Sequence, residues 1–146
     1  MRNIEPRVSI KKESAIPRVY VVAGIIKNSN NEVLLSKRHV KQHQGGLWEF
    51  PGGKKEDNET VKQALARELE EELGISIVDA EPFHKLEHDY SDKAVLLDFW
   101  LVQSFSGEPQ GLEGQQGQWV PIEKLKHYQF PEANVPVVEA LLAARG

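Results

Sequence analysis

Four glutamates stand close together near the end of one amphipathic segment: Glu68, Glu70, Glu71 and Glu72. Apolar residues recur every four positions across 60–73, which predicts a helix that Gly74 terminates. Like charges three or four positions apart cost roughly 0.2–0.5 kcal/mol per pair, and the C-terminal end of a helix disfavours anions. This cluster lowers the stability of the helix, so we predict that the carboxylates have a functional role.

Helix geometry places these carboxylates unequally. At about 100° per residue, Glu72 falls on the apolar stripe and Glu68 at its edge, whereas Glu70 points away. An inward carboxylate must be neutralised or coordinated. Arg67 can pair with Glu71 four positions on, but one arginine cannot neutralise the whole group. A hard divalent cation such as Mg²⁺ can, together with substrate phosphates; the alternative is a solvated acidic surface.

The other segments predict mainly strands around this helix. We expect strands at 19–26, 33–38, 83–89, 94–104 and 118–120, one helical turn at 122–125 and a last helix at 135–144. The first two strands should form a β-hairpin across the turn at 28–31. Residues 39–47 and 107–117 should be loops, and 51–53 an irregular turn. This pattern predicts an α/β (α+β) fold, with a mixed central β-sheet sandwiched between helices.

The composition limits the class of protein. A chain of 146 residues suits one domain, which we place at 18–146 after a loose leader at 1–17. The absence of cysteine excludes disulfide scaffolds and thiolate zinc sites. A formal net charge of -4 argues against broad binding to nucleic-acid backbones, and no apolar run is long enough to cross a membrane. Without a secretory signal in the leader, we expect a cytoplasmic location.

Residues 53–75 carry a motif with fixed spacing, G-x5-E-x7-R-E-U-x-E-E-x-G-U, in which U is an aliphatic residue. Its fixed positions are filled by Gly53, Glu59, Arg67, Glu68, Leu69, Glu71, Glu72, Gly74 and Ile75. This motif resembles the Nudix box. Outside it, segments such as 22–26, 48–54 and 130–134 are similar to the MutT branch of that family, and the similarity extends from Val19 to Leu142.

The resemblance implies the Nudix fold, with the box forming a loop–helix–loop. It also implies metal-dependent hydrolysis of a nucleoside triphosphate to the nucleoside monophosphate and pyrophosphate. MutT-like members prefer oxidised purine nucleotides such as 8-oxo-dGTP, so the implied role is removal of mutagenic precursors. The implied cofactor is Mg²⁺, with Mn²⁺ as a substitute. The implied partner is a small-molecule nucleotide, without stable binding to nucleic acid or membrane; the sequence leaves the oligomeric state open, and we favour a monomer.

The resemblance also assigns roles to individual residues. The metal would be bound by the carbonyl of Gly52 and by the carboxylates of Glu68, Glu71, Glu72 and Glu113. Three residues would take part in catalysis. Glu68 would act as a metal ligand or as the base, Glu113 as a ligand and candidate base, and Arg67 would orient the glutamates. The substrate would be contacted by Arg38, Phe50, Lys93 and Asn134.

Several of these residues also have a purely structural interpretation. Asn134 stands at the start of the last predicted helix and suits an N-cap, and Phe50 suits core packing. Glu59 suits a brace at the entrance of the central helix, where negative charge is favourable. The substrate could instead be a pyrimidine triphosphate, a dinucleoside polyphosphate or a nucleotide sugar. A nucleotide-binding module without catalysis is the third hypothesis.

Overall fold

The computed structural model describes residues 18–37, 46–89 and 93–144. Its strands are β1 (Arg18–Ile26), β2 (Glu32–Lys37), β3 (Trp48–Glu49), β4 (Gly52–Lys54), β5 (Ser76–Asp89), β6 (Ala94–Ser106) and β7 (Gly117–Pro121). Its helices are α2 (Val61–Leu73) and α3 (Val135–Ala144), with two short 3-10 helices, η2 (Ile122–His127) and η3 (Glu132–Asn134). The predicted leader lies outside the described residues, as does most of the predicted loop at 39–47.

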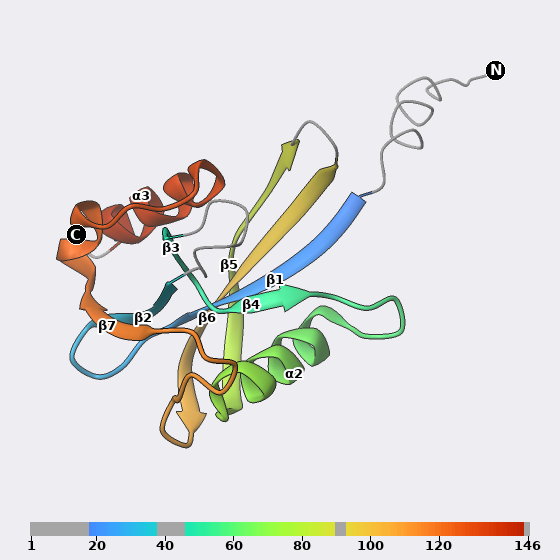
Figure 1. Cartoon of the computed structure of the whole chain (residues 1–146), viewed down its shortest axis with the longest axis horizontal. Helices are drawn as coiled ribbons and strands as arrows, with labels where there is room; N and C mark the ends of the chain where they lie inside the picture. Colours follow the sequence, from blue (N-terminus) through green and yellow to red (C-terminus); the bar gives the residue numbers. More distant parts are fainter. Residues whose placement is uncertain (1–17, 38–45, 90–92, 145–146) are drawn as a thin grey trace.

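The strands form two sheets that lie between α2 and α3 (Figure 1). The larger sheet has the order β4-β1-β6-β5, and the smaller one has the order β3-β2-β7. β1 runs parallel to β6, while β4 and β5 are antiparallel to their neighbours, so the larger sheet is mixed. The prediction of a mixed sheet between helices is confirmed.

The predicted β-hairpin between the first two strands is wrong. β1 pairs with β6 along its whole length and with β4 on its other side, so both of its edges are occupied. β2 therefore pairs with β3 and β7 in the smaller sheet. The turn itself is present: the side-chain oxygen of Asn28 accepts the backbone N–H of Glu32 at 3.0 Å, and a bridge joins Lys27 to Val33.

Two further predicted boundaries were wrong. β5 begins at Ser76, well before the expected start at 83, and it is an edge strand with register shifts near Ile77 and Pro82. Such irregularities interrupt the two-residue alternation by which a strand is recognised. The expected irregular turn at 51–53 is largely the short strand β4, which pairs with β1.

Helix α2 is fixed at both ends and along one face. The Thr60 hydroxyl accepts the N–H of Gln63 at 3.1 Å, and the Gln63 side chain accepts the N–H of Thr60 at 2.9 Å, which completes a capping box. Gly74 ends the helix in the left-handed conformation, with φ of 74°. The buried face consists of Ala64, Leu65, Leu69 and Leu73, which pack with residues of both sheets. The acidic residues of the motif therefore stand on a rigid support.

Helix α3 covers the opposite side of the sheets (Figure 1). Its buried residues Val137, Val138 and Leu141 join a second core with Phe50 and Phe99. The helix is apolar but short. No helix in the described part of the chain combines the length and hydrophobicity that a membrane span requires.

Candidate metal and nucleotide site

The carboxylate of Glu72 lies half-buried between α2 and the start of β4. Its Oε1 accepts the backbone N–H of Gly52 at 3.1 Å, which confirms that the side chain faces inward. Burial raises the pKa of Glu72 to about 8, with further contributions from the charges of Glu49, Glu113 and Glu68. The charged form of Glu72 is therefore destabilised by its surroundings, and a bound cation would relieve this.

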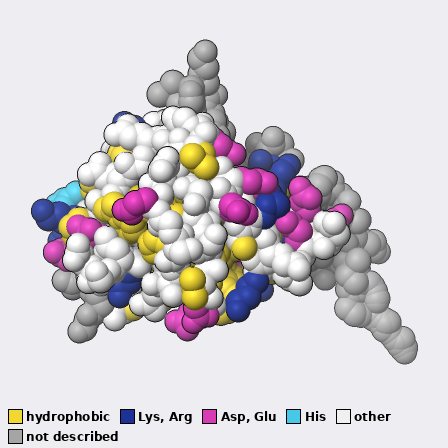
Figure 2. Space-filling view, turned by 90° about the horizontal axis from the view of Figure 1, so that it is seen from below, with side chains coloured by type: hydrophobic (Ala, Val, Ile, Leu, Met, Phe, Trp, Pro, Cys, Tyr) yellow, Lys and Arg dark blue, Asp and Glu magenta, His cyan; other side chains and the backbone are white. Residues whose placement is uncertain are grey.

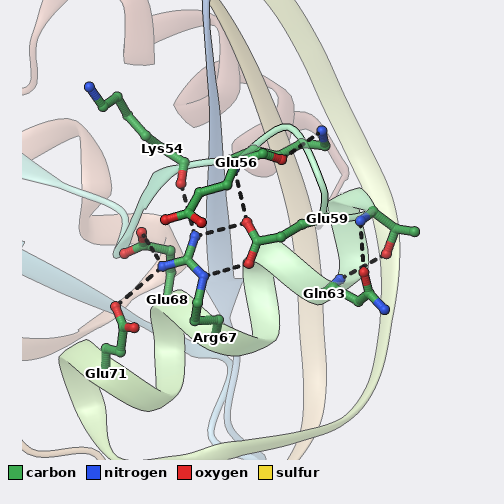
Figure 3. Close-up of polar contacts among 9 residues, drawn as sticks. Lys54, Glu56, Glu59, Gln63, Arg67, Glu68 and Glu71 are labelled. Atoms are coloured by element: carbon green, nitrogen blue, oxygen red, sulfur yellow. Dashed lines mark hydrogen bonds and ion pairs between the residues drawn. The ribbon is translucent and has the colours of Figure 1, made fainter.

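Arg67 holds the acidic residues on the outer side of α2 in place (Figure 3). Its Nε donates to Glu59 Oε2 at 2.5 Å and its Nη2 to Glu59 Oε1 at 2.9 Å. Its Nη1 donates to Glu68 Oε2 at 3.1 Å and to Glu71 Oε1 at 3.3 Å, and its Nη2 also donates to the Lys54 carbonyl at 3.1 Å. One guanidinium thus ties the loop before α2 to two of the motif glutamates.

Glu59 braces the loop before α2 through Arg67 rather than by capping the helix. Thr60 is the capping residue, while Glu59 Oε1 accepts the backbone N–H of Glu56 at 2.9 Å and both oxygens accept from Arg67. The hydrogen bond from Arg67 is the main reason why the pKa of Glu59 falls to about 2. In turn, Glu59 raises the pKa of Arg67 above its usual value. The brace keeps its charges over the whole physiological pH range.

Glu68 is affected both by burial, as Glu72 is, and by the ion pair with Arg67, as Glu59 is. Burial raises the pKa of Glu68, and this is opposed by the charge and hydrogen bond of Arg67. The carboxylate also packs against Gly53, where an added Cβ would lie 2.4 Å from Glu68 Cδ. At Gly52, an added Cβ would lie 2.0 Å from the carbonyl oxygen of Val22. The two glycines are therefore required for different reasons, one by a carboxylate and one by the backbone of β1.

We expect Gly53→Ala to reduce catalysis more than stability, because the added methyl displaces the flexible end of Glu68. We expect Gly52→Ala to destabilise the fold by about 1–3 kcal/mol, because it meets rigid backbone. Urea denaturation followed by circular dichroism measures the second effect, and kcat of the folded fraction measures the first. Equal loss of stability in both variants would contradict this division of roles.

The loop that carries Glu113 is docked onto the C-terminal end of α2. The backbone N–H of Gln110 donates to the Leu73 carbonyl, and that of Leu112 donates to the Glu72 carbonyl, both at 2.9 Å. These bonds satisfy carbonyls that the end of a helix leaves without partners. Glu113 is exposed, yet its charge contributes to the raised pKa of Glu72 and of Glu68. The loop thus brings Glu113 to the glutamates of the motif.

The structure describes three of the four predicted substrate residues. Phe50 is 4% exposed, stacks with Phe130 at 5.8 Å between ring centroids and meets Phe99 edge-on at 5.9 Å. This is the packing that its structural interpretation predicts. Asn134 is half-buried directly before α3, Lys93 is exposed before β6, and Arg38 lies outside the described residues.

The donor set fits a hard divalent cation. Carboxylate and carbonyl oxygens are the ligands that Mg²⁺ takes in proteins, and burial, with neighbouring negative charges, raises the pKa of Glu72. Within 18–37, 46–89 and 93–144, no three acidic or histidine side chains converge on one point. Figure 2, seen from the side where α2 lies, shows acidic side chains on both sides of basic ones.

Comparison with known proteins agrees with this architecture. The family model described as NUDIX domain matches residues 22–140. The 8-oxo-dGTP diphosphatase of Escherichia coli K12 is 44% identical over 124 residues, which cover 85% of this chain and 96% of that protein. The chain belongs to the Nudix family. The predicted family and fold are thereby confirmed, and a divalent metal site is the family's general requirement.

Other relatives show that names differ among similar Nudix proteins. The CTP pyrophosphohydrolase of Escherichia coli K12 is 39% identical over 127 residues, which cover 87% of this chain and 93% of that protein. A solved structure of MutT, from a study of Aliivibrio salmonicida and Vibrio cholerae, is 47% identical with a TM-score of 0.78. That similarity covers 88% of this chain and 99% of the other. Overall similarity therefore does not choose between a purine and a pyrimidine substrate.

Proposed function

We propose that this Nudix protein hydrolyses nucleoside triphosphates to nucleoside monophosphate and pyrophosphate, with a preference for oxidised purines such as 8-oxo-dGTP. The observation that carries the proposal is the half-buried Glu72 carboxylate, set among other carboxylates on a helix with the complete Nudix box. The relatives named 8-oxo-dGTP diphosphatase support the substrate. We further propose that the protein acts as a cytoplasmic monomer on free nucleotides.

The cofactor we propose is Mg²⁺, with Mn²⁺ as a substitute. The ligands would be the Gly52 carbonyl and the carboxylates of Glu68, Glu71, Glu72 and Glu113. When bound, the ion neutralises phosphate oxygens and lowers the pKa of a coordinated water. Glu72 and Gly52 fix the inner edge of the site through their mutual hydrogen bond. Arg67 restrains Glu68 and Glu71 through a hydrogen bond to one oxygen of each.

Proton removal from the attacking water needs a carboxylate close to the substrate. Glu68 is our first candidate, because burial raises its pKa toward the working pH while Arg67 holds its position. Glu113 is the second candidate, on a loop fixed to the end of α2. Glu68→Gln and Glu113→Gln separate them: the variant of the base should lose kcat even at saturating Mn²⁺, whereas loss of a ligand alone is partly restored.

The substrate test is pyrophosphate release from a panel of normal and oxidised nucleotides with Mg²⁺ or Mn²⁺. We expect kcat/KM for 8-oxo-dGTP to exceed that for dGTP and CTP. A higher kcat/KM for CTP would favour the alternative function, a pyrimidine triphosphate pyrophosphohydrolase, which the 39% identical relative supports. Absence of turnover across the panel, with retained nucleotide binding, would favour a non-catalytic module.

Asn134 is the residue that we propose reads the oxidised base, since an amide offers both a donor and an acceptor to a purine edge. Asn134→Ala should lower kcat/KM for 8-oxo-dGTP by roughly 10-fold, about the value of one lost hydrogen bond to a neutral group, with little change for dGTP. Asn134→Asp, which still suits an N-cap, separates base recognition from helix capping. If Asn134→Ala lowers the melting temperature but leaves the 8-oxo-dGTP preference intact, the residue is only a cap.

A further inference from the structure

Residues 107–117 form the loop that carries Glu113, and backbone hydrogen bonds fix this loop near both of its ends. Near its start, two backbone N–H groups donate to the last carbonyls of α2, as described above. At its end, the Gln116 carbonyl accepts the backbone N–H of Lys37 at 2.9 Å, and the chain enters β7. Glu113 stands between these two attachments, so its position depends on how the middle of the loop is supported.

The middle of the loop is a tight turn that directs the side chain of Gln115 inward. The backbone N–H of Gly114 donates to the Gly111 carbonyl at 3.2 Å, and Gly114 has a φ of 86°. An added Cβ at Gly111 would lie 2.2 Å from the Gln115 carbonyl oxygen, so the turn closes directly on Gln115. The polar atoms of the Gln115 side chain are buried, whereas Glu113 is exposed. The two side chains therefore have opposite surroundings although they are two residues apart.

Two side chains beneath this turn carry buried polar atoms without partners. Ser36 of β2 is 2% exposed, and its Oγ has no hydrogen-bond partner among the described residues. The same holds for the side-chain nitrogen and oxygen of Gln115 within that part of the chain. Buried polar atoms without partners are rare in native proteins, because burial without a hydrogen bond is costly. Ordered water or a ligand is therefore expected beside both residues.

Ser36 and Gln115 line the same cavity, which has a volume of about 210 Å³. Loop residues form one wall of this cavity, and β2, β7 and Leu73 of α2 form the others. None of the lining residues is charged, and their hydroxyl and amide groups suit water. Since a water molecule takes about 30 Å³ of liquid volume, the cavity has room for several. None of the proposed metal ligands lines it, so these waters are separate from those of the ion.

We propose that waters in this cavity join Ser36 to Gln115 and thereby hold the loop that positions Glu113. A water that bridges two protein groups is nearly as favourable as a direct hydrogen bond. The Gln115 amide and the Ser36 hydroxyl each donate and accept, so such waters satisfy both side chains. Ser36 and Gln115 are positioning residues, because they act on Glu113 only through the loop. The catalytic part of this inference rests on the proposed function, whereas the water bridge does not.

Hydrogen exchange of backbone amides in the full-length protein, measured by NMR in EDTA, tests the water bridge. Ser36→Ala and Gln115→Leu should each speed the exchange of the Leu112 N–H by roughly 2–10-fold, the value of one net hydrogen bond. The double variant should exchange no faster than the faster single variant, because either change breaks the same bridge. Ser36→Thr, which keeps the hydroxyl, should exchange like the wild type. Ser104→Ala, at an exposed serine of β6, is the matched control and should have no effect.

Two results of the exchange experiment would overturn the bridge. The first is unchanged exchange of Leu112 in both single variants, or single effects that multiply in the double variant. The second is equal acceleration of the Leu141 amide, which lies in the buried part of α3, because the changes would then act on the whole fold.

Pyrophosphate release at saturating substrate tests the effect on Glu113. Gln115→Leu should lower kcat by roughly 2–10-fold, for the same reason as in the exchange experiment. In a Glu113→Gln protein, the same change should lower kcat no further, because the carboxylate that the loop positions is already lost. A further loss of equal size would overturn the positioning role. If Glu113→Gln itself keeps the wild-type kcat, the proposed role of Glu113 and its positioning both fail, and the exchange experiment alone decides the bridge.

Discussion

Glu72→Gln should abolish most of the activity and at the same time make the metal-free protein more stable at alkaline pH. The carboxylate is held against the Gly52 N–H, where an amide oxygen can still accept that hydrogen bond. The amide lacks the charge that a divalent ion requires. Because such an ion supplies several kcal/mol to phosphate chemistry and each 1.4 kcal/mol is tenfold in rate, we expect kcat to fall by about 1,000-fold.

The stability effect follows from the direction of the pKa shift. The pKa of Glu72 rises from 4.5 to about 8, so between these values the folded protein holds a proton that the unfolded chain releases. The protonated Glu72 side chain contributes fully to the free energy of unfolding below pH 4.5, and this contribution is lost as the pH rises through 8. Glu72→Gln removes this dependence. In EDTA at pH 9 the variant should therefore melt above the wild type, and at pH 4 the two should be similar.

Thermal unfolding by circular dichroism in EDTA, from pH 4 to 9, measures this difference, and pyrophosphate release at saturating Mg²⁺ measures the activity. Glu70→Gln is the matched control, because Glu70 is exposed on the same helix and points away from the site. It should leave activity and the pH profile unchanged. Activity of Glu72→Gln within tenfold of the wild type would contradict the metal role.

The features that the sequence predicted correctly are those coded by local periodicity. The four-residue repeat of apolar side chains gives both the bounds of α2 and the inward direction of Glu72, which the bond to Gly52 confirms. The capping box of Thr60 and Gln63 was equally readable, because it follows a known spacing, and it was missed. Such signals need no knowledge of distant partners.

Features that depend on distant partners could not be predicted in the same way. The path of β2 is decided by β6 and β4, which occupy both edges of β1. The sequence pattern assigns no role to Glu49, whose charge contributes to the raised pKa of Glu72. The strand β3 has two residues, too few to show an alternation of side chains. Only the rings packed on either side of Glu49 in the sequence reveal which face it takes. The Nudix box likewise gave no account of the Glu113 loop, which is positioned by backbone hydrogen bonds.

Arg67 is the second residue whose replacement should have a large effect, because it positions two glutamates of the motif. Its guanidinium holds both oxygens of Glu59, one oxygen each of Glu68 and Glu71, and the Lys54 carbonyl. A lysine ammonium is a single point charge and cannot span these partners. Because groups that orient metal ligands typically contribute 10–100-fold, we expect both Arg67→Ala and Arg67→Lys to lower kcat by roughly 10–100-fold.

Two measurements separate positioning from a merely structural role. If Arg67 aims Glu68 and Glu71, the folded Arg67→Lys protein should bind Mn²⁺ more weakly, whereas Lys62→Ala, an exposed change on α2, should not. The hydrogen bond from Arg67 is the main reason why the pKa of Glu59 falls to about 2. The charged Glu59 carboxylate therefore stabilises the folded protein above pH 4.5, and this stabilisation is lost as the pH falls through 2. Arg67→Ala should weaken that dependence, and the backbone hydrogen bond from Glu56 retains the rest.

A variant of Arg67 that is less stable but keeps wild-type Mn²⁺ affinity and kcat would show that the guanidinium braces the loop without directing the carboxylates.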